Sequence, residues 1–332
     1  MRFLKILLAI LVVLAAVYLL GPNPTTPVYS TVLPEIPSGD SALETYILEQ
    51  EAPHKIKPDN EARIVWFDDT LKQKTEYAIV YLHGFSASQE EGNPVHRKIA
   101  RQFGCNLYLA RLSQHGIDTS DALVNLTAEN LWESAKQAYA IGKQLGHKVI
   151  LMGTSTGGTL ALQLAAAYPD IAALVLYSPN IEINDPNAWL LNNPWGLQIA
   201  RKVKGSYYNV IPKKTPEYKQ YWNQEYRLEA LVQLEELLET TMTKKTFEKV
   251  KQPVLSLYYY KDENNQDPVV KVSAIKKMMA SLGTPVEKEE MVAIPNAGSH
   301  VLASPIQSKD ILSVEKETAE FLKNMLQLKP VQ

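Results

Sequence analysis

The 332-residue sequence contains a single cysteine, Cys105, and only six histidines. One cysteine cannot form a disulfide within the chain, and an isolated thiol among apolar residues is typical of a buried side chain. The histidines are scattered, without the paired H-x-x-x-H type of spacing that metal sites use. The sequence therefore gives no support for a metal site.

An excess of charge is also missing, because 34 basic and 36 acidic residues leave a formal net charge of −2. Outside the first few residues the chain has no basic cluster of the kind that binds nucleic acid. It also lacks internal repeats and low-complexity tracts. These absences favour an ordinary globular protein that acts on a small molecule.

One long apolar run is present, at residues 6–20, between two basic residues and a Gly-Pro-Asn-Pro segment. Its length is just sufficient to cross a thin hydrocarbon core, so residues 1–22 are predicted to be a signal anchor or transmembrane segment. Bulky residues at 17–20 leave no small-x-small cleavage pattern, although a cleaved signal peptide remains an alternative. The preceding basic residues should stay in the cytoplasm, which predicts a membrane-anchored protein whose body lies on the non-cytoplasmic side, the periplasm in a bacterium.

Beyond this run, apolar segments of strand length alternate with segments of helix length. This rhythm predicts an α/β fold with a mostly parallel, doubly wound sheet. Strands are expected at residues 62–67, 77–82, 106–112, 149–152, 172–177, 253–258 and 288–294. Helices are expected at residues 43–51, 95–103, 127–145 and 309–327, and directly after Gly158.

The rhythm stops between residues 181 and 250, where no strand run is found and aromatic residues are frequent. This segment is predicted to be a helical lid insertion that covers the site, since ligands of open α/β sheets bind outside the carboxyl ends of the strands. The alternative is that its aromatic rings only pack the insertion onto the core. The core itself is then expected to comprise residues 61–180 and 251–327, and residues 23–60 a tether and N-terminal extension.

The most informative motif is Gly153-Thr154-Ser155-Thr156-Gly157, a G-x-S-x-G between a predicted strand and a predicted helix. A serine on such a sharp turn stands clear of the sheet, and the flanking glycines let neighbouring backbone approach closely. The start of the following helix also offers free backbone N–H groups that can stabilise an oxyanion. Ser155 is therefore the candidate nucleophile.

A serine nucleophile needs a base, and the base needs a carboxylate that orients it. Five of the six histidines precede Ser155, and His300 follows it, after the last predicted strand in a loop of small residues. Sites built on a G-x-S-x-G turn between strand and helix use the chain order serine, acid, histidine, which makes His300 the candidate base. Two aspartates follow the strand at 253–258, Asp262 and Asp267, and position alone permits either.

These motifs resemble the α/β-hydrolase superfamily, in particular its carboxylesterases, monoacylglycerol lipases and serine aminopeptidases. In that family the acid commonly stands in a D-x-V-V motif, and Asp267-Pro268-Val269-Val270 matches it. The family also has an H-G-x turn after an early strand, which His83-Gly84-Phe85 matches. The resemblance thus implies Asp267 as the acid, and it implies an oxyanion hole formed by the backbone N–H groups of Phe85 and Thr156.

The expected function is that of a membrane-tethered serine hydrolase that cleaves carboxylic esters through an acyl-enzyme, without cofactor or metal. The aromatic lid and the nearby bilayer favour an acyl or lipid-like ester. A peptidase or amidase of the aminopeptidase type is an alternative, because four lid glutamates could receive a free amino group: Glu225, Glu229, Glu235 and Glu236. A non-catalytic binding protein on the same fold is a second alternative.

Overall fold

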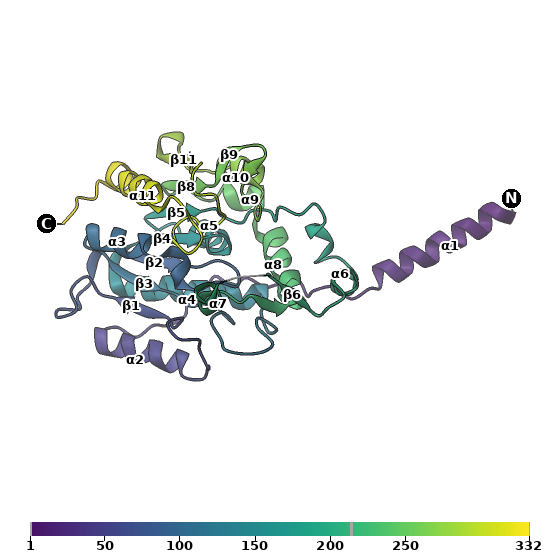
Figure 1. The fold of residues 1–332 in the computed structure, drawn as a ribbon, viewed down its shortest axis with the longest axis horizontal. Helices are drawn as coiled ribbons and strands as arrows, with labels where there is room; N and C mark the ends of the chain where they lie inside the picture. Colours follow the sequence, from purple (N-terminus) through teal and green to yellow (C-terminus); the bar gives the residue numbers. More distant parts are fainter. Residues whose placement is uncertain (1, 213–214, 332) are drawn as a thin grey trace.

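The computed structural model describes residues 2–212 and 215–331 (Figure 1). Among these residues, seven strands form one sheet in the order β1-β3-β2-β4-β5-β8-β11. Every neighbouring pair is parallel except β1 and β3. The sheet confirms the predicted α/β fold with a mostly parallel arrangement.

The strands of this sheet are β1 (Arg63–Val65), β2 (Thr75–Leu82), β3 (Asn106–Leu109), β4 (Gly146–Thr154), β5 (Ala173–Tyr177), β8 (Val254–Tyr258) and β11 (Glu289–Ala293). Two small antiparallel sheets add β6 (Tyr208–Val210) with β7 (Glu225–Arg227), and β9 (Tyr260–Asp262) with β10 (Asn265–Gln266). The α-helices are α1 (Arg2–Leu19), α2 (Asp40–Glu51), α3 (Val95–Gln102), α4 (Ala128–Leu145), α5 (Thr156–Ala167), α6 (Gly196–Lys204), α7 (Pro216–Tyr221), α8 (Leu228–Thr241), α9 (Lys244–Phe247), α10 (Val272–Met279) and α11 (Ile311–Leu326). Short 3-10 helices are η1 (Gln89–Gly92), η2 (Ala188–Leu190) and η3 (Val286–Lys288).

Strand β2 shows why the central strands read as continuous apolar runs. Ala78, Val80 and Leu82 pack into the core on one face of the sheet, together with α4 and α5. Ile79 and Tyr81, which alternate with them, pack into the core on the other face, with α3 and α11. A strand covered on both faces needs apolar side chains at every position, which is the pattern that predicted it.

The segment at 181–250, called the lid below, carries the helices α6, α7, α8 and α9. It also contains the β6–β7 pair, which was not predicted. Each of these strands has only three residues, too few to give a period-2 pattern that can be recognised in the sequence. Residues 213–214 of this segment lie outside the described residues.

Residues 22–36, here called the strap, connect α1 to the body of the molecule. The strap runs against α4 and α5, where side chains donate to its carbonyls: Trp132 Nε1 to Ser30 at 2.7 Å, and Lys136 Nζ to Val32 at 2.8 Å. A proline-rich extended segment makes no internal backbone hydrogen bonds, so its carbonyls are open to donors from the body. The strap therefore holds the body close to the end of α1.

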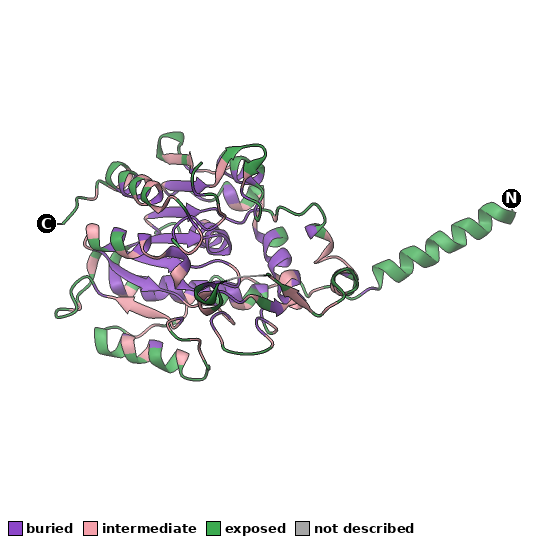
Figure 2. Cartoon of the chain, in the orientation of Figure 1, coloured by how far each residue is buried: buried purple, intermediate pink, exposed green. Residues whose placement is uncertain are grey.

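Helix α1 projects from the rest of the molecule, and none of its residues is buried (Figure 2). Its 18 residues make it long and apolar enough to cross a membrane, by length and composition alone. A secretory signal sequence meets the same test, so α1 agrees with either of the two sequence interpretations.

Candidate active site

Ser155 occupies a sharp turn between β4 and α5, with φ 53° and ψ −117°. Positive φ is strained for a residue with a Cβ, and such strain is concentrated at functional sites. Gly157 makes the turn possible, because a Cβ at this position would lie 1.9 Å from the carbonyl oxygen of Leu82. The turn brings the serine to the carboxyl ends of the strands, where the lid covers the sheet.

Asp267 and His300 come together from two separate loops at this end of the sheet. His300 Nδ1 lies 2.7 Å from Asp267 Oδ2. The other carboxylate oxygen of Asp267 accepts the backbone N–H groups of Val269 and Val270, at 2.8 and 3.0 Å. With Asp267 almost fully buried, these contacts fix both its side chain and the orientation of the imidazole.

The two groups shift each other's protonation in opposite directions. Burial alone would raise the pKa of Asp267, but the facing His300 ring and the two backbone N–H donors outweigh it and lower that pKa. For His300, burial favours the neutral ring, yet the charge of Asp267 and the hydrogen bond to it raise the pKa above its usual value. Asp267 is thus an anion that supports a more basic imidazole.

Asp262, the competing carboxylate, turns away from this pair. It is exposed at the β9–β10 hairpin, where it accepts the backbone N–H groups of Asn264 and Asn265 at 2.9 and 3.0 Å. The polar run that lengthens this loop is therefore a small hairpin closed by Asp262 itself. The structure brings Asp267, and not Asp262, to His300.

The loop after β2 carries Gly84 and Phe85 alongside the serine turn. A Cβ at Gly84 would lie 3.0 Å from the Cβ of Ser155, so the two backbones are in close contact. Among the described residues, the backbone N–H groups of Phe85 and Thr156 have no protein acceptor. Both are free to donate to a ligand.

His83, at the start of this loop, is structural. Its Nε2 accepts the backbone N–H of Leu112 at 3.0 Å, and its Nδ1 lies 2.9 Å from the carbonyl oxygen of Gly84. Burial lowers its pKa well below the usual value, so the ring stays neutral. A neutral ring that donates at Nδ1 and accepts at Nε2 satisfies both contacts.

Glu91, on η1, is a member of the site that the sequence did not reveal. Its buried carboxylate accepts the backbone N–H of Gly84 at 2.5 Å and lines the same cavity as Ser155 and His300. Burial raises the pKa of Glu91 to about 7. A glutamate in a polar loop carries no sequence signal for burial, so only the fold identifies it.

A cavity of about 790 Å³ joins these groups to the lid. Ser155, Phe85 and His300 line it on the core side. On the lid side its lining is mostly apolar and includes Ile199, Val203, Tyr218, Trp222, Leu231 and Leu234. A volume of this size and character suits a small molecule with an extended apolar part.

The four lid glutamates expected as receptors for an amino group do not line this cavity. Glu229 is paired instead with Arg201 and Arg227, at 2.7 and 2.6 Å. Glu236 accepts the side-chain amide of Asn192. The acidic side chains that do line the cavity are Glu91 and Asp185.

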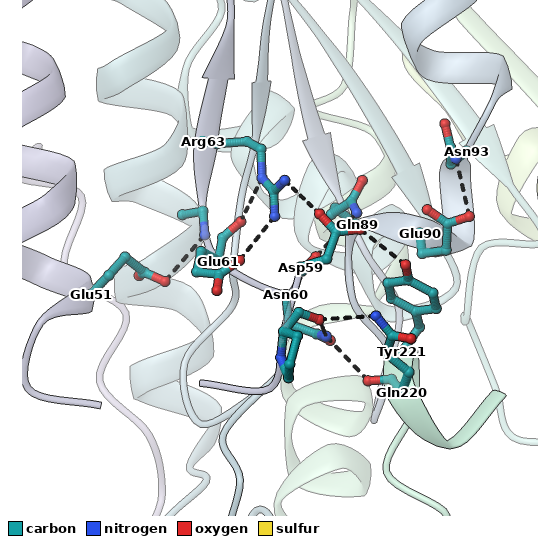
Figure 3. A network of polar contacts seen from close by, with 12 residues as sticks. Glu51, Asp59, Asn60, Glu61, Arg63, Gln89, Glu90, Asn93, Gln220 and Tyr221 are labelled. Atoms are coloured by element: carbon teal, nitrogen blue, oxygen red, sulfur yellow. Dashed lines mark hydrogen bonds and ion pairs between the residues drawn. The ribbon is translucent and has the colours of Figure 1, made fainter. Parts of the chain in front are cut away.

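A polar network fixes one part of the lid to the body (Figure 3). Tyr221, at the end of α7, donates to Asp59 at 3.0 Å, and Asp59 also pairs with Arg63 at 2.6 Å. Asn60 donates to the carbonyl oxygen of Gln220 at 3.1 Å. These contacts hold α7 beside η1 and the loop of Gly84.

Within residues 2–212 and 215–331, no group of three or more histidine, cysteine or acidic side chains could hold a metal ion. The side chains and backbone at the serine turn carry reactive groups of their own. They provide a serine on a strained turn, a histidine paired with a carboxylate, and unpaired N–H donors beside them.

Comparison with known proteins gives one family and a set of similar folds. A family model described as "Serine aminopeptidase, S33" matches residues 128–295, half of the chain. A thermostable monoacylglycerol lipase from Bacillus sp. (strain H-257) is 30% identical over 105 residues, which are 32% of this chain and 41% of the lipase. The chain thus aligns with less than half the length of that relative.

Solved structures agree on the fold. A structure reported with two metagenome-derived lipolytic enzymes, LipS and LipT, has a TM-score of 0.64 at 17% identity, covering 81% of this chain and 99% of that one. Monoacylglycerol lipase from Paleococcus ferrophilus has a TM-score of 0.58 at 15% identity, covering 80% and 99%. At these identities the likeness establishes the α/β-hydrolase fold.

Proposed function

The chain belongs to the serine aminopeptidase family of α/β-hydrolases, and from that membership we propose that it is a serine hydrolase that cleaves carboxylic esters. The observation that carries the proposal is that Ser155 lines one cavity together with His300, which is paired with Asp267. The metagenomic lipolytic enzymes and the two monoacylglycerol lipases favour an ester over an amide.

In the proposed mechanism, Ser155 Oγ attacks the carbonyl carbon of the ester while His300 Nε2 takes its proton. Asp267 keeps the other ring nitrogen protonated, which leaves Nε2 free as the base. The N–H groups of Phe85 and Thr156 donate to the oxyanion, and each such donor is worth about 3 kcal/mol of barrier. His300 then protonates the leaving alcohol, and water attacks the acyl-enzyme by the reverse sequence.

The apolar lid lining supports an ester with a long acyl chain as the substrate, and it is the reason to prefer a lipid-like ester. An aminopeptidase would need a carboxylate facing the substrate's amino group. Glu91 and Asp185 are the acidic side chains available for that role, since the lid glutamates lie outside the cavity lining. We therefore retain the aminopeptidase only as the second candidate.

We further propose that α1 is a membrane anchor, with Arg2 and Lys5 on the cytoplasmic side and the hydrolase body on the other. The proposal rests on the length, composition and full exposure of α1. Two separate experiments test it: alkaline extraction of isolated membranes, and protease treatment of intact spheroplasts. A protein that is released by alkali, or protected from the protease, would contradict it.

The experiment for the activity uses the full chain in detergent with nitrophenyl esters of increasing acyl length, and aminoacyl nitroanilides beside them. We expect ester turnover that increases with chain length and disappears in Ser155→Ala. Labelling of the protein by a fluorophosphonate should disappear in the same variant. Turnover that survives in Ser155→Ala, or a preference for the nitroanilides, would overturn the proposal.

A further inference from the structure

Helix α6 of the lid presents an apolar stripe to the outside. Trp195 at its N-cap, Ile199 and Val203 recur every four residues and so lie on one face of the helix. Their exposed fractions are 36%, 41% and 79%. Lys202, seven residues after Trp195, lies at the end of the same face and is also exposed. We call these four residues the α6 stripe.

The stripe is joined directly to the end of α1. The indole N–H of Trp195 donates to the carbonyl oxygen of Val17 at 3.0 Å. The backbone N–H of Trp195 donates to the carbonyl oxygen of Pro22 at 2.9 Å. Gly21 lies against the indole ring, where a Cβ would be 2.1 Å from its nitrogen. Figure 1 shows α1 leaving the molecule beside α6 and β6.

We propose that the α6 stripe docks on the surface of the bilayer in which α1 is anchored, so that the cavity opens onto the membrane. The inference rests on the proposed function and on α1 as the anchor. If α1 lies in the membrane, its last turn is at the interface, and Trp195 is one hydrogen bond away from that turn. The lid helix is therefore held at the level of the lipid headgroups.

The chemistry of the stripe fits this position. Tryptophan is favoured at the membrane interface, where its ring is apolar and its N–H is polar. The Lys202 ammonium makes no ion pair among the described residues, which leaves it available to an anionic headgroup. Its alkyl stem can follow the apolar face while the charge reaches the phosphates.

Two of the four stripe residues also line the active-site cavity. Ile199 and Val203 line the cavity as well as being exposed, so they form part of its rim. Leu231 and Leu234, which are not exposed, belong to the same apolar lining as Ser155. An acyl chain that leaves the bilayer would stay in contact with apolar side chains until its ester reaches the serine. The substrate class is therefore an ester dissolved in the membrane.

A depth measurement on the full chain tests the docking itself. Cys105 is the single cysteine and is buried, so a thiol introduced by Val203→Cys can be labelled selectively with an NBD fluorophore. Leu312→Cys on α11 is the matched control, because Leu312 is 70% exposed and α11 lies at the end of the molecule away from α1 (Figure 1).

Both labelled proteins are reconstituted in nanodiscs of phosphatidylcholine and phosphatidylglycerol that contain doxyl-labelled lipid. We expect strong quenching of the label at position 203 and little at position 312. Equal quenching at the two positions would overturn the docking. So would an unquenched label at 203, with the unlabelled Val203→Cys variant forming a disulfide to a second copy of the chain.

An activity measurement tests the delivery of substrate. The double variant Trp195→Glu with Lys202→Glu changes two stripe residues outside the cavity lining. We expect its kcat/KM for a long-chain ester embedded in the disc to fall about tenfold, the ratio that corresponds to about 1.4 kcal/mol. Its kcat/KM for a soluble short-chain ester should stay within about a factor of two, and Leu312→Glu should change neither.

An equal loss toward both esters, or no loss toward the embedded ester, would overturn the delivery of substrate through the stripe. If the unaltered protein hydrolyses neither ester, the proposed function fails, while the quenching result still decides the docking. The two failures can therefore be told apart.

Discussion

Replacing Asp267 by asparagine tests the proposed role of the buried carboxylate with little change of shape. The two backbone N–H groups that Asp267 Oδ1 accepts would hold the amide oxygen in the same place. The amide NH2 would then face His300 Nδ1, which must give up its proton to accept a hydrogen bond. The neutral ring would carry that proton on Nε2, where it can no longer act as a base.

A triad whose histidine is held in this wrong tautomer loses kcat by about 10⁴, which corresponds to about 5 kcal/mol of barrier. We expect a loss of that size in Asp267→Asn for a soluble nitrophenyl ester, with the thermal unfolding temperature little changed. Any residual activity should extend to lower pH, because the carboxylate that raises the pKa of His300 is gone. The measurement is kcat/KM as a function of pH.

Asp262→Asn is the matched control, since Asp262 is exposed and holds only its own hairpin. Its asparagine can still accept the same backbone N–H groups, so activity should stay within about a factor of two of the unaltered protein. The assignment would be refuted if Asp267→Asn kept more than about a tenth of the activity. It would also be refuted if Asp262→Asn lost as much.

Three further predictions concern stability and the turn. Because burial raises the pKa of Glu91 to about 7, the folded state favours the neutral acid, and the stability that it contributes below pH 4.5 is lost as the pH rises through 7. This loss is on the order of 3 kcal/mol, and Glu91→Gln should remove it. The measurement is the free energy of unfolding at pH 5 and at pH 8. Gly157→Ala places a Cβ against the carbonyl oxygen of Leu82, so it should lower the free energy of unfolding by about 1–3 kcal/mol and remove most of the ester turnover. A stable and active variant would show that the turn can relax. Lys136→Met leaves the carbonyl oxygen of Val32 without its donor and should lower the free energy of unfolding by about 1–3 kcal/mol. It should also speed proteolysis within the strap. An unchanged cleavage pattern would show that other contacts hold the strap.

The parts of the fold that the sequence predicted are those in which one segment carries its own pattern. Strand β2 is apolar at almost every position because both of its faces are covered, and β4 with α5 is marked by the glycines of the serine turn. His300 could be chosen because chain order left no other histidine after Ser155. These signals are local, or depend only on order along the chain.

The parts that the sequence missed depend on tertiary contacts and not on a pattern within one segment. Glu91 looks like any loop glutamate until the backbone of Gly84 is brought against it. The strap has the composition of a flexible linker, and side chains of α4, Tyr168 and α8 give it a fixed course. The β6–β7 pair joins two strands of three residues each, and neither is long enough to show a strand pattern in the sequence.

The strap also has a consequence for the order in which the molecule can be assembled. It is synthesised before the segments that bind it: Val28 pairs with Glu129, 101 positions later, and Tyr29 with Thr240, 211 positions later. Closing such long loops is slow, because their chain entropy is lost before the contacts form. The strap must therefore wait until α8 has left the ribosome. If α1 is the anchor proposed above, docking of the strap is the step that draws the finished body against the bilayer.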